Sequence, residues 1–181
     1  MNKISTRLLM SCAAVGVAGG VVFTVNAWAG GLLANLLPLA YGLTVGLYFI
    51  PGALAQALFR RPGVGLLTSA LAGLVASPFQ PIFFGAFLVS MAIGVLQELP
   101  FLVTRYRVWR WWLFLIGSLA SGAIMTAGSF HVLAGGDYAP AGAATIVAGF
   151  LLSPAAGTML ALWLAERLSA AGVGRGLRPR T

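Results

Sequence analysis

The sequence predicts an all-α integral membrane protein, a bundle of six transmembrane helices with both termini in the cytoplasm. Of its 181 residues, 60% are hydrophobic and only 8% are charged, whereas a soluble globular domain carries about 25% charged residues. Long apolar runs, each near the roughly 20 residues that cross a bilayer as a helix, recur along the chain. The Lys and Arg residues lie only in short segments between these runs. These three observations indicate one membrane domain, residues 1–181.

The first three spans are predicted from apolar runs that basic residues or turns delimit. The first, residues 8–25, follows Lys3 and Arg7. The second, residues 37–59, ends at a pair of arginines. The third, residues 63–77, starts directly after that pair and ends at a connection without Lys or Arg.

The last three spans continue the same pattern. The fourth, residues 82–103, ends at a segment with three arginines. The fifth, residues 111–133, leads into a connection that lacks Lys and Arg and contains Asp137. The sixth, residues 141–164, is followed by four arginines, and residues 169–181 are predicted to be a mobile cytoplasmic tail.

The side of the membrane follows from the eleven cations. They precede the first span and follow the second, fourth and sixth spans, while the other three connections contain none. Because cytoplasmic segments carry the excess of Lys and Arg, both termini are predicted to be cytoplasmic, in a multi-pass protein of the cell's inner (plasma) membrane. An error of one span would put cations on both sides, so the alternation also supports the count of six.

The N-terminus admits a second interpretation. Lys3, Arg7, an apolar stretch and the Ala27-Trp28-Ala29 motif also resemble a secretory signal with its cleavage site. Small residues at Ala14 and Ala18 form a helix-packing face that a discarded peptide would not need. Retention is therefore the favoured interpretation.

The scarcity of reactive side chains excludes most enzymatic functions. The chain has one His, one Cys and three acidic residues, too few for a nucleophile with its base, a carboxylate pair or a multidentate metal site. No Gly-rich loop is followed by Lys and Ser or Thr, so any ATP must be hydrolysed by another chain. We expect no catalytic residue, metal or cofactor. Because the +8 charge follows the membrane topology, no nucleic-acid partner is expected, and the single Cys12 is expected to pack in the core.

Glu98 needs a physical reason, because a carboxylate inside the bilayer costs about 2.5 to 3.5 kcal/mol on insertion scales. One interpretation is a ligand anchor at the floor of a pocket, where the carboxylate accepts two hydrogen bonds from an aminopyrimidine edge. The other is structural: Glu98 pairs with a snorkelling Arg or caps the backbone near Pro100.

Aromatic and amide residues gather towards the predicted outer side, where they are candidates to bind a flat heterocycle. Tyr48 lies deep in the second span, whereas a lone His near a membrane surface, such as His131, is more often solvated than a ligand. Trp28 also fits an interfacial aromatic belt, which is the favoured interpretation of this residue. The first external connection is predicted to carry Asn26, Trp28 and Asn35, and further outer candidates are Gln80, His131 and Tyr138.

Four sequence blocks occur in order along the predicted spans: residues 16–23 with Asn26 following, 46–52, 60–66 and 98–109. Together they resemble the substrate-binding S components of energy-coupling-factor (ECF) importers, in the YkoE-like branch associated with thiamine and hydroxymethylpyrimidine. The family tends to have Trp where Tyr48 stands and Gln where Ile93 stands, so a related ring-bearing ligand also remains open.

The resemblance implies a vitamin-binding subunit that docks on a separate membrane coupling protein, which two ATPase subunits energise. It also implies that Ala14 and Ala18 form the docking face, since small residues four apart let another helix approach closely. The ligand pocket is predicted to have Glu98 as its floor, with Asn26, Trp28 and Tyr48 above it. Two rival functions remain: a membrane scaffold that binds no metabolite, and a self-sufficient secondary transporter.

Overall fold

The computed structural model describes residues 5–36, 42–128, 140–174 and 176–177, and every regular element in them is helical. Within these ranges, five stretches are long and apolar enough to cross a membrane, and Val64–Phe79 is a shorter apolar helix. Together they confirm the predicted all-α bundle of six membrane helices. The elements are α1 (Thr6–Leu36), the 3₁₀ helix η1 (Val45–Phe49), α3 (Ile50–Phe59), α4 (Val64–Ala76), the 3₁₀ helix η2 (Ser77–Phe79), α5 (Phe84–Val103), α6 (Trp111–Gly128) and α8 (Pro140–Ala170).

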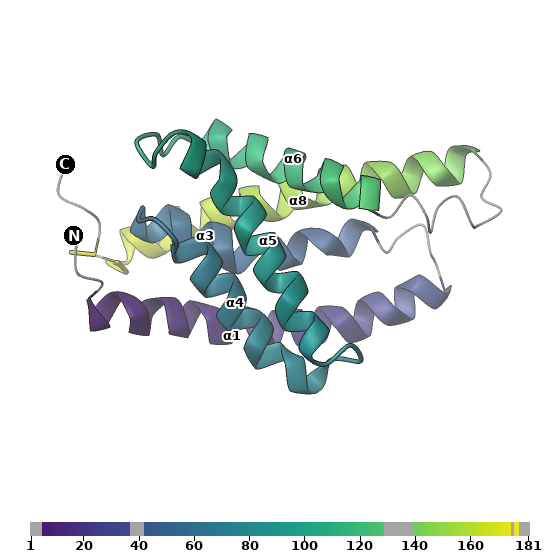
Figure 1. The fold of residues 1–181 in the computed structure, drawn as a ribbon, viewed down its shortest axis with the longest axis horizontal. Helices are drawn as coiled ribbons and strands as arrows, with labels where there is room; N and C mark the ends of the chain where they lie inside the picture. Colours follow the sequence, from purple (N-terminus) through teal and green to yellow (C-terminus); the bar gives the residue numbers. More distant parts are fainter. Residues whose placement is uncertain (1–4, 37–41, 129–139, 175, 178–181) are drawn as a thin grey trace.

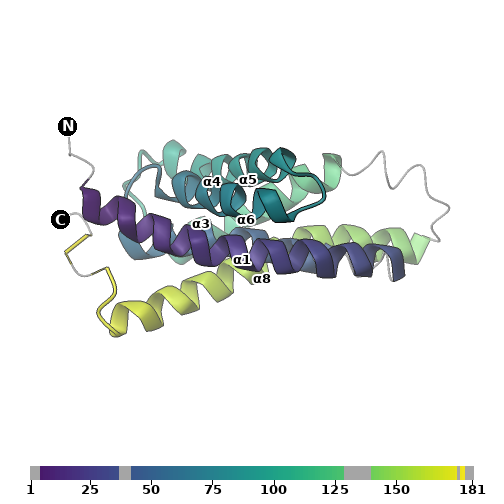
Figure 2. The same ribbon diagram turned by 90° about the horizontal axis from the view of Figure 1, so that it is seen from below.

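The helices form an elongated bundle in which α1 and α8 run along the long axis and the α4–α5 hairpin is inclined to them (Figures 1 and 2). The α3–α4 turn, the α5–α6 connection and the end of α8 lie at the same end of the bundle (Figure 1). We call it the arginine-rich end, because the first two of these segments carry Arg60, Arg61, Arg105, Arg107 and Arg110. The opposite end is the distal end. The cytoplasmic location of the arginine-rich end stays a prediction.

Helix α1 corrects the predicted first external connection. It continues past Val25 to Leu36, so Asn26, Trp28 and Asn35 lie in a helix and not in a loop. The helix continues because its buried face continues: Phe23 and Asn26 are buried at helical spacing. The predicted end of the first span at residue 25 is therefore too early.

Glycines allow α1 to pack closely on α4. A Cβ atom at Gly16 would approach the Cβ of Leu71 to 2.8 Å, and one at Gly20 would approach Val75 to 2.7 Å. Small residues therefore bring these two helix backbones together. The face of α1 that carries Ala14 and Ala18 is left exposed on the outside of the bundle.

The second membrane helix is irregular where it crosses α8. Its stretch before Pro51 is the 3₁₀ helix η1, which agrees with the local loss of a helical N–H donor at proline. Gly46 of η1 lies directly against Ser153 and Gly157 of α8, so a side chain at position 46 has no room. The Gly46 N–H donates a hydrogen bond of 2.7 Å to the Ser153 hydroxyl. Small residues of α8 therefore let the second membrane helix approach it closely.

The largest apolar core lies towards the arginine-rich end. It joins α1, α3, α5, α6 and α8, and Cys12 is fully buried in it. Part of the predicted mobile tail contacts this core, because Leu177 is buried and its carbonyl accepts a 2.8 Å hydrogen bond from Arg61 Nε. The segment around Leu177 therefore packs against the C-terminal end of α3.

Candidate functional site

Three of the residues that sequence reasoning selected converge around Phe23 of α1. Gln80 donates a hydrogen bond from Nε2 to the Phe23 carbonyl at 3.3 Å, and the Tyr48 ring lies 4.8 Å from the Phe23 ring. Asn26, one turn further along α1, donates from Nδ2 to the Thr44 carbonyl at 3.2 Å. Asn26 and Gln80 are 4% and 6% exposed. We call Phe23, Asn26, Tyr48 and Gln80 the Phe23 cluster.

Trp28 lies beside this cluster on the exposed side of α1. Its indole Nε1 donates a 2.9 Å hydrogen bond to the Phe79 carbonyl in η2, while 60% of the residue stays exposed. Trp28 and Gln80 together attach the α4–α5 connection to α1, since both bonds cross between these two segments. In this structure both side chains hold helices together.

Tyr48 occupies the centre of the region because it contacts two apolar clusters. On one side it packs against Phe23 and two buried alanines of α4. On the other it packs against buried side chains from η1, α5 and α8, among them Phe49, Ile93 and Phe150. A half-buried tyrosine between apolar walls is the kind of surface on which a flat ring packs, since it combines an apolar body with a polar tip.

The remaining outer candidates fall outside what the structure describes. Asn35 lies in the last turn of α1, and its side chain is not among the described ones. His131 and Tyr138 lie between α6 and α8, also outside the described residues. Their roles as ligand residues stay predictions.

Glu98 lies near the arginine-rich end and is bonded to the backbone at the start of α4. Its Oε1 accepts hydrogen bonds from the N–H groups of Gly65 at 2.8 Å and Leu66 at 3.4 Å. The first N–H groups of a helix have no partner within it, and the positive end of the helix dipole stabilises a carboxylate there. The geometry thus matches the structural interpretation of Glu98, although the backbone that it caps is that of α4 and not that near Pro100.

Two buried glutamines that the sequence interpretation passed over form the polar centre of the bundle. Gln97 donates from Nε2 to the Phe49 carbonyl at 2.7 Å, and Gln56 donates to the Gln97 carbonyl at 3.3 Å. They border a cavity of about 10 Å³, which Ser118 and Thr158 also line and which suits a single water molecule. Both could have been identified from the sequence, because each is an amide side chain inside an apolar run.

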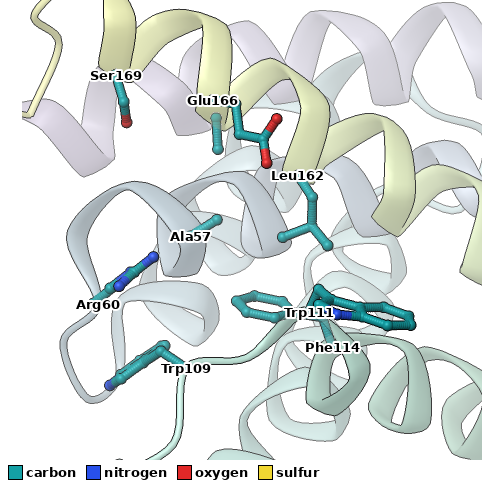
Figure 3. Close-up of a pocket in the computed structure, with 9 residues that line it drawn as sticks. Ala57, Arg60, Trp109, Trp111, Phe114, Leu162, Glu166 and Ser169 are labelled. Atoms are coloured by element: carbon teal, nitrogen blue, oxygen red, sulfur yellow. The ribbon is translucent and has the colours of Figure 1, made fainter.

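A larger pocket of about 340 Å³ opens at the arginine-rich end, between α3, α6 and α8. Figure 3 shows Glu166 and Leu162 of α8 across from Arg60, Trp109 and Trp111. Its walls are mixed, with one acidic, one basic and several aromatic side chains. Trp109 and Trp111 line the pocket together with Arg60, an arrangement typical of the aromatic residues at a membrane–water interface.

An apolar groove of about 340 Å³ runs along the exposed face of α1. Ala14 and Ala18 line it from α1, and Pro51 and Leu54 line it from α3. Leu168 of α8 also lines it. The expectation that Ala14 and Ala18 form a docking face therefore concerns this groove.

Six apolar helices define a membrane protein, and among the described residues no three His, Cys, Asp or Glu side chains gather into a metal site. The protein is therefore an integral membrane protein in which polar residues cluster between helices. Residues 8–125 match the model of the family described as "ABC-type cobalt transport system, permease component", and the chain belongs to this family.

Two known proteins agree with that class. Over 112 residues the chain is 27% identical to YkoE of Bacillus subtilis (strain 168), whose name gives it as a candidate HMP/thiamine permease protein. The match covers 59% of this chain and 54% of YkoE, so it spans about half the length of that relative. A crystal structure of an S-component of an ECF transporter superposes with a TM-score of 0.85 at 21% identity, covering 96% of this chain and 90% of the other. The fold is that of an S component, which confirms the resemblance read from the sequence blocks.

Proposed function

We propose that this chain is the substrate-binding membrane subunit of an ECF-type importer for thiamine, its hydroxymethylpyrimidine precursor or a related small heterocycle. The observation that carries the proposal is the convergence of Asn26, Tyr48 and Gln80 around Phe23, within a fold of S-component type. The ligand class comes from the likeness to YkoE. The site lies on the side of the bundle away from the predicted cytoplasmic cations.

The Phe23 cluster has the chemistry that a substituted pyrimidine needs. Tyr48 supplies an aromatic face for a flat ring, and the two amides supply donors and acceptors for ring nitrogens and amino groups. Each amide has one donor in addition to the N–H that it gives to a backbone carbonyl. Ligand binding in this region would also use Trp28, Asn35, His131 and Tyr138, the outer candidates of the sequence analysis.

The chain also needs partners in this proposal. Import requires a membrane coupling protein and two ATPase subunits, because the sequence contains no phosphate-binding loop of its own. The groove beside Ala14 and Ala18 is the proposed docking surface for a helix of the coupling protein, since its lining is apolar and these two small residues on α1 allow a close approach.

Two measurements on the purified protein test the proposal. Mass spectrometry of the co-purifying small molecules should find a pyrimidine-containing vitamin or precursor, and ligand addition should change tryptophan fluorescence in a saturable way. Liposomes with this chain alone should not accumulate the ligand, whereas liposomes with the complete ATP-driven complex should. Uptake by the chain alone would establish a secondary transporter, and failure to bind any ring-bearing vitamin would favour a scaffold.

A further inference from the structure

The α4–α5 connection, residues 77–83, exposes an unusually apolar surface. No charged residue occurs between Arg61 and Glu98. Phe79, Ile82, Phe83 and the adjoining Phe84 are each 58 to 67% exposed. A connection in water would expose polar side chains, and a contiguous patch of this kind marks contact with lipid or with another protein.

The polar side chains of this connection point inward and are hydrogen-bonded. Ser77 donates from Oγ to the Gly73 carbonyl at 2.7 Å. Gln80 donates to the Phe23 carbonyl of α1 and is 6% exposed. The arrangement is the reverse of a solvated loop, in which amides and hydroxyls face water.

Much of the backbone is also satisfied within the protein. The N–H groups of Gln80 and Phe83 donate to the carbonyls of Ser77 and Gln80, while Pro78 and Pro81 have no N–H to satisfy. The Phe79 carbonyl accepts the indole N–H of Trp28 at 2.9 Å. A segment that lies in hydrocarbon has no water to bond to, so its backbone N–H and C=O groups must pair within the protein. At a wet interface an indole directs its N–H towards water or head groups. The Trp28 indole instead donates to a backbone carbonyl, which also favours surroundings without water.

The α4–α5 hairpin is too short to reach the distal ends of α1 and α8. Helices α4 and η2 have 13 and 3 residues, a length of about 25 Å, against the roughly 30 Å of a hydrocarbon layer. Figures 1 and 2 show the inclined hairpin ending short of the distal ends of α1 and α8. The connection therefore lies at a shallower level along the bundle axis than those helix ends.

We propose that the α4–α5 connection is a lipid-embedded tip: its exposed phenylalanines pack among lipid acyl chains, and it does not emerge into the aqueous phase. Trp28 and Gln80 fasten this tip to α1. Lipid acyl chains then cover the tip on the α4–α5 side, while α1 and α8 continue past its level towards the distal end (Figure 1).

Spin-label accessibility in liposomes of phosphatidylethanolamine and phosphatidylglycerol tests the proposal. In a Cys12→Ala background, single cysteines are placed at Ile82 and Phe84, with Ile116 on the exposed face of α6 as the lipid control and Arg107 as the water control. The labels at 82 and 84 should collide with oxygen at least threefold more than with a water-soluble nickel chelate, as at 116. Position 107 should show the reverse ratio.

Two results would overturn the proposal. Nickel accessibility at 82 and 84 equal to that at 107 would place the tip in water. Labels protected from both oxygen and nickel would mean that another protein copy covers the patch instead of lipid. Membrane-impermeant maleimide labelling of the same cysteines gives an independent reading, with less than a tenth of the labelling at position 107 expected at position 82.

Discussion

Glu98 Oε1 lies 2.8 Å from the backbone nitrogen of Gly65, so the one acidic side chain buried in the described bundle joins α5 to the first turn of α4. The carboxylate is 7% exposed. Its position at the positive end of a helix reduces the cost of a charge in the membrane. A role in fastening these two helices follows directly from that contact.

Removal of this carboxylate should weaken the bundle. Glu98→Ala leaves the Gly65 N–H without its acceptor, and an unsatisfied buried donor costs about 1 to 3 kcal/mol, which thermal unfolding of the purified protein measures. Glu98→Gln keeps an acceptor oxygen and should lose less. A Glu98→Gln variant that is stable but binds ligand at least tenfold more weakly, about 1.4 kcal/mol, would instead establish Glu98 as a ligand anchor.

A side chain at Gly46 should disrupt the crossing of η1 and α8. The Cβ of Gly46→Ala would collide with the Ser153 backbone, and overpacking in a close helix contact costs about 1 to 3 kcal/mol. The matched control is Gly31→Ala, because a Cβ at Gly31 meets no heavy atom within 4 Å. Equal unfolding temperatures for the two variants would contradict the close crossing.

The groove along α1 should be required for transport but not for ligand binding. In the Ala14→Trp, Ala18→Trp double variant, indole rings fill the groove, and ATP-driven uptake by the assembled complex should fall at least tenfold while affinity is retained. Val17→Trp is the control, because Val17 is exposed on α1 and does not line the groove. Normal uptake by the double variant would remove this surface from the docking proposal.

Tyr106, in the connection between α5 and α6, should make stability depend on alkaline pH. Burial and the charge of Glu98 raise the pKa of Tyr106 from 10.0 to about 12. The folded state therefore favours the neutral phenol. This contribution is complete below pH 10 and is lost as pH rises towards 12.

The matched comparison is Tyr106→Phe. The unfolding temperature of the wild type, measured from pH 9 to pH 12, should fall relative to that of the variant as pH rises, because only the wild type has a phenol whose ionisation the folded state disfavours. A constant difference across the range would show that Tyr106 does not titrate with a raised pKa.

The sequence predicted the helices well because apolar runs and cation positions report the membrane directly. It missed the extent of α1, since the continuation of a buried face through Asn26 depends on where α4 and η1 pack. Small residues predicted close approach, but not which helices meet. Gly16 faces α4, whereas the neighbouring Ala14 faces outward.

For the candidate site, residue type was more predictable than role. Polarity in an apolar chain identified Asn26, Gln80 and Glu98, because each needs a partner when buried. Their partners are backbone groups of Thr44, Phe23 and Gly65, far away in sequence and brought near only by the tertiary fold.

Calorimetric titration of the purified protein with thiamine and with hydroxymethylpyrimidine tests the central claim most directly. We predict saturable one-to-one binding of at least one of them, weakened tenfold or more in Tyr48→Ala and retained in a folded Trp163→Phe variant on the exposed face of α8. Absence of saturable binding to either compound would contradict the ligand class. Equal affinity in wild type and folded Tyr48→Ala would contradict the location of the site.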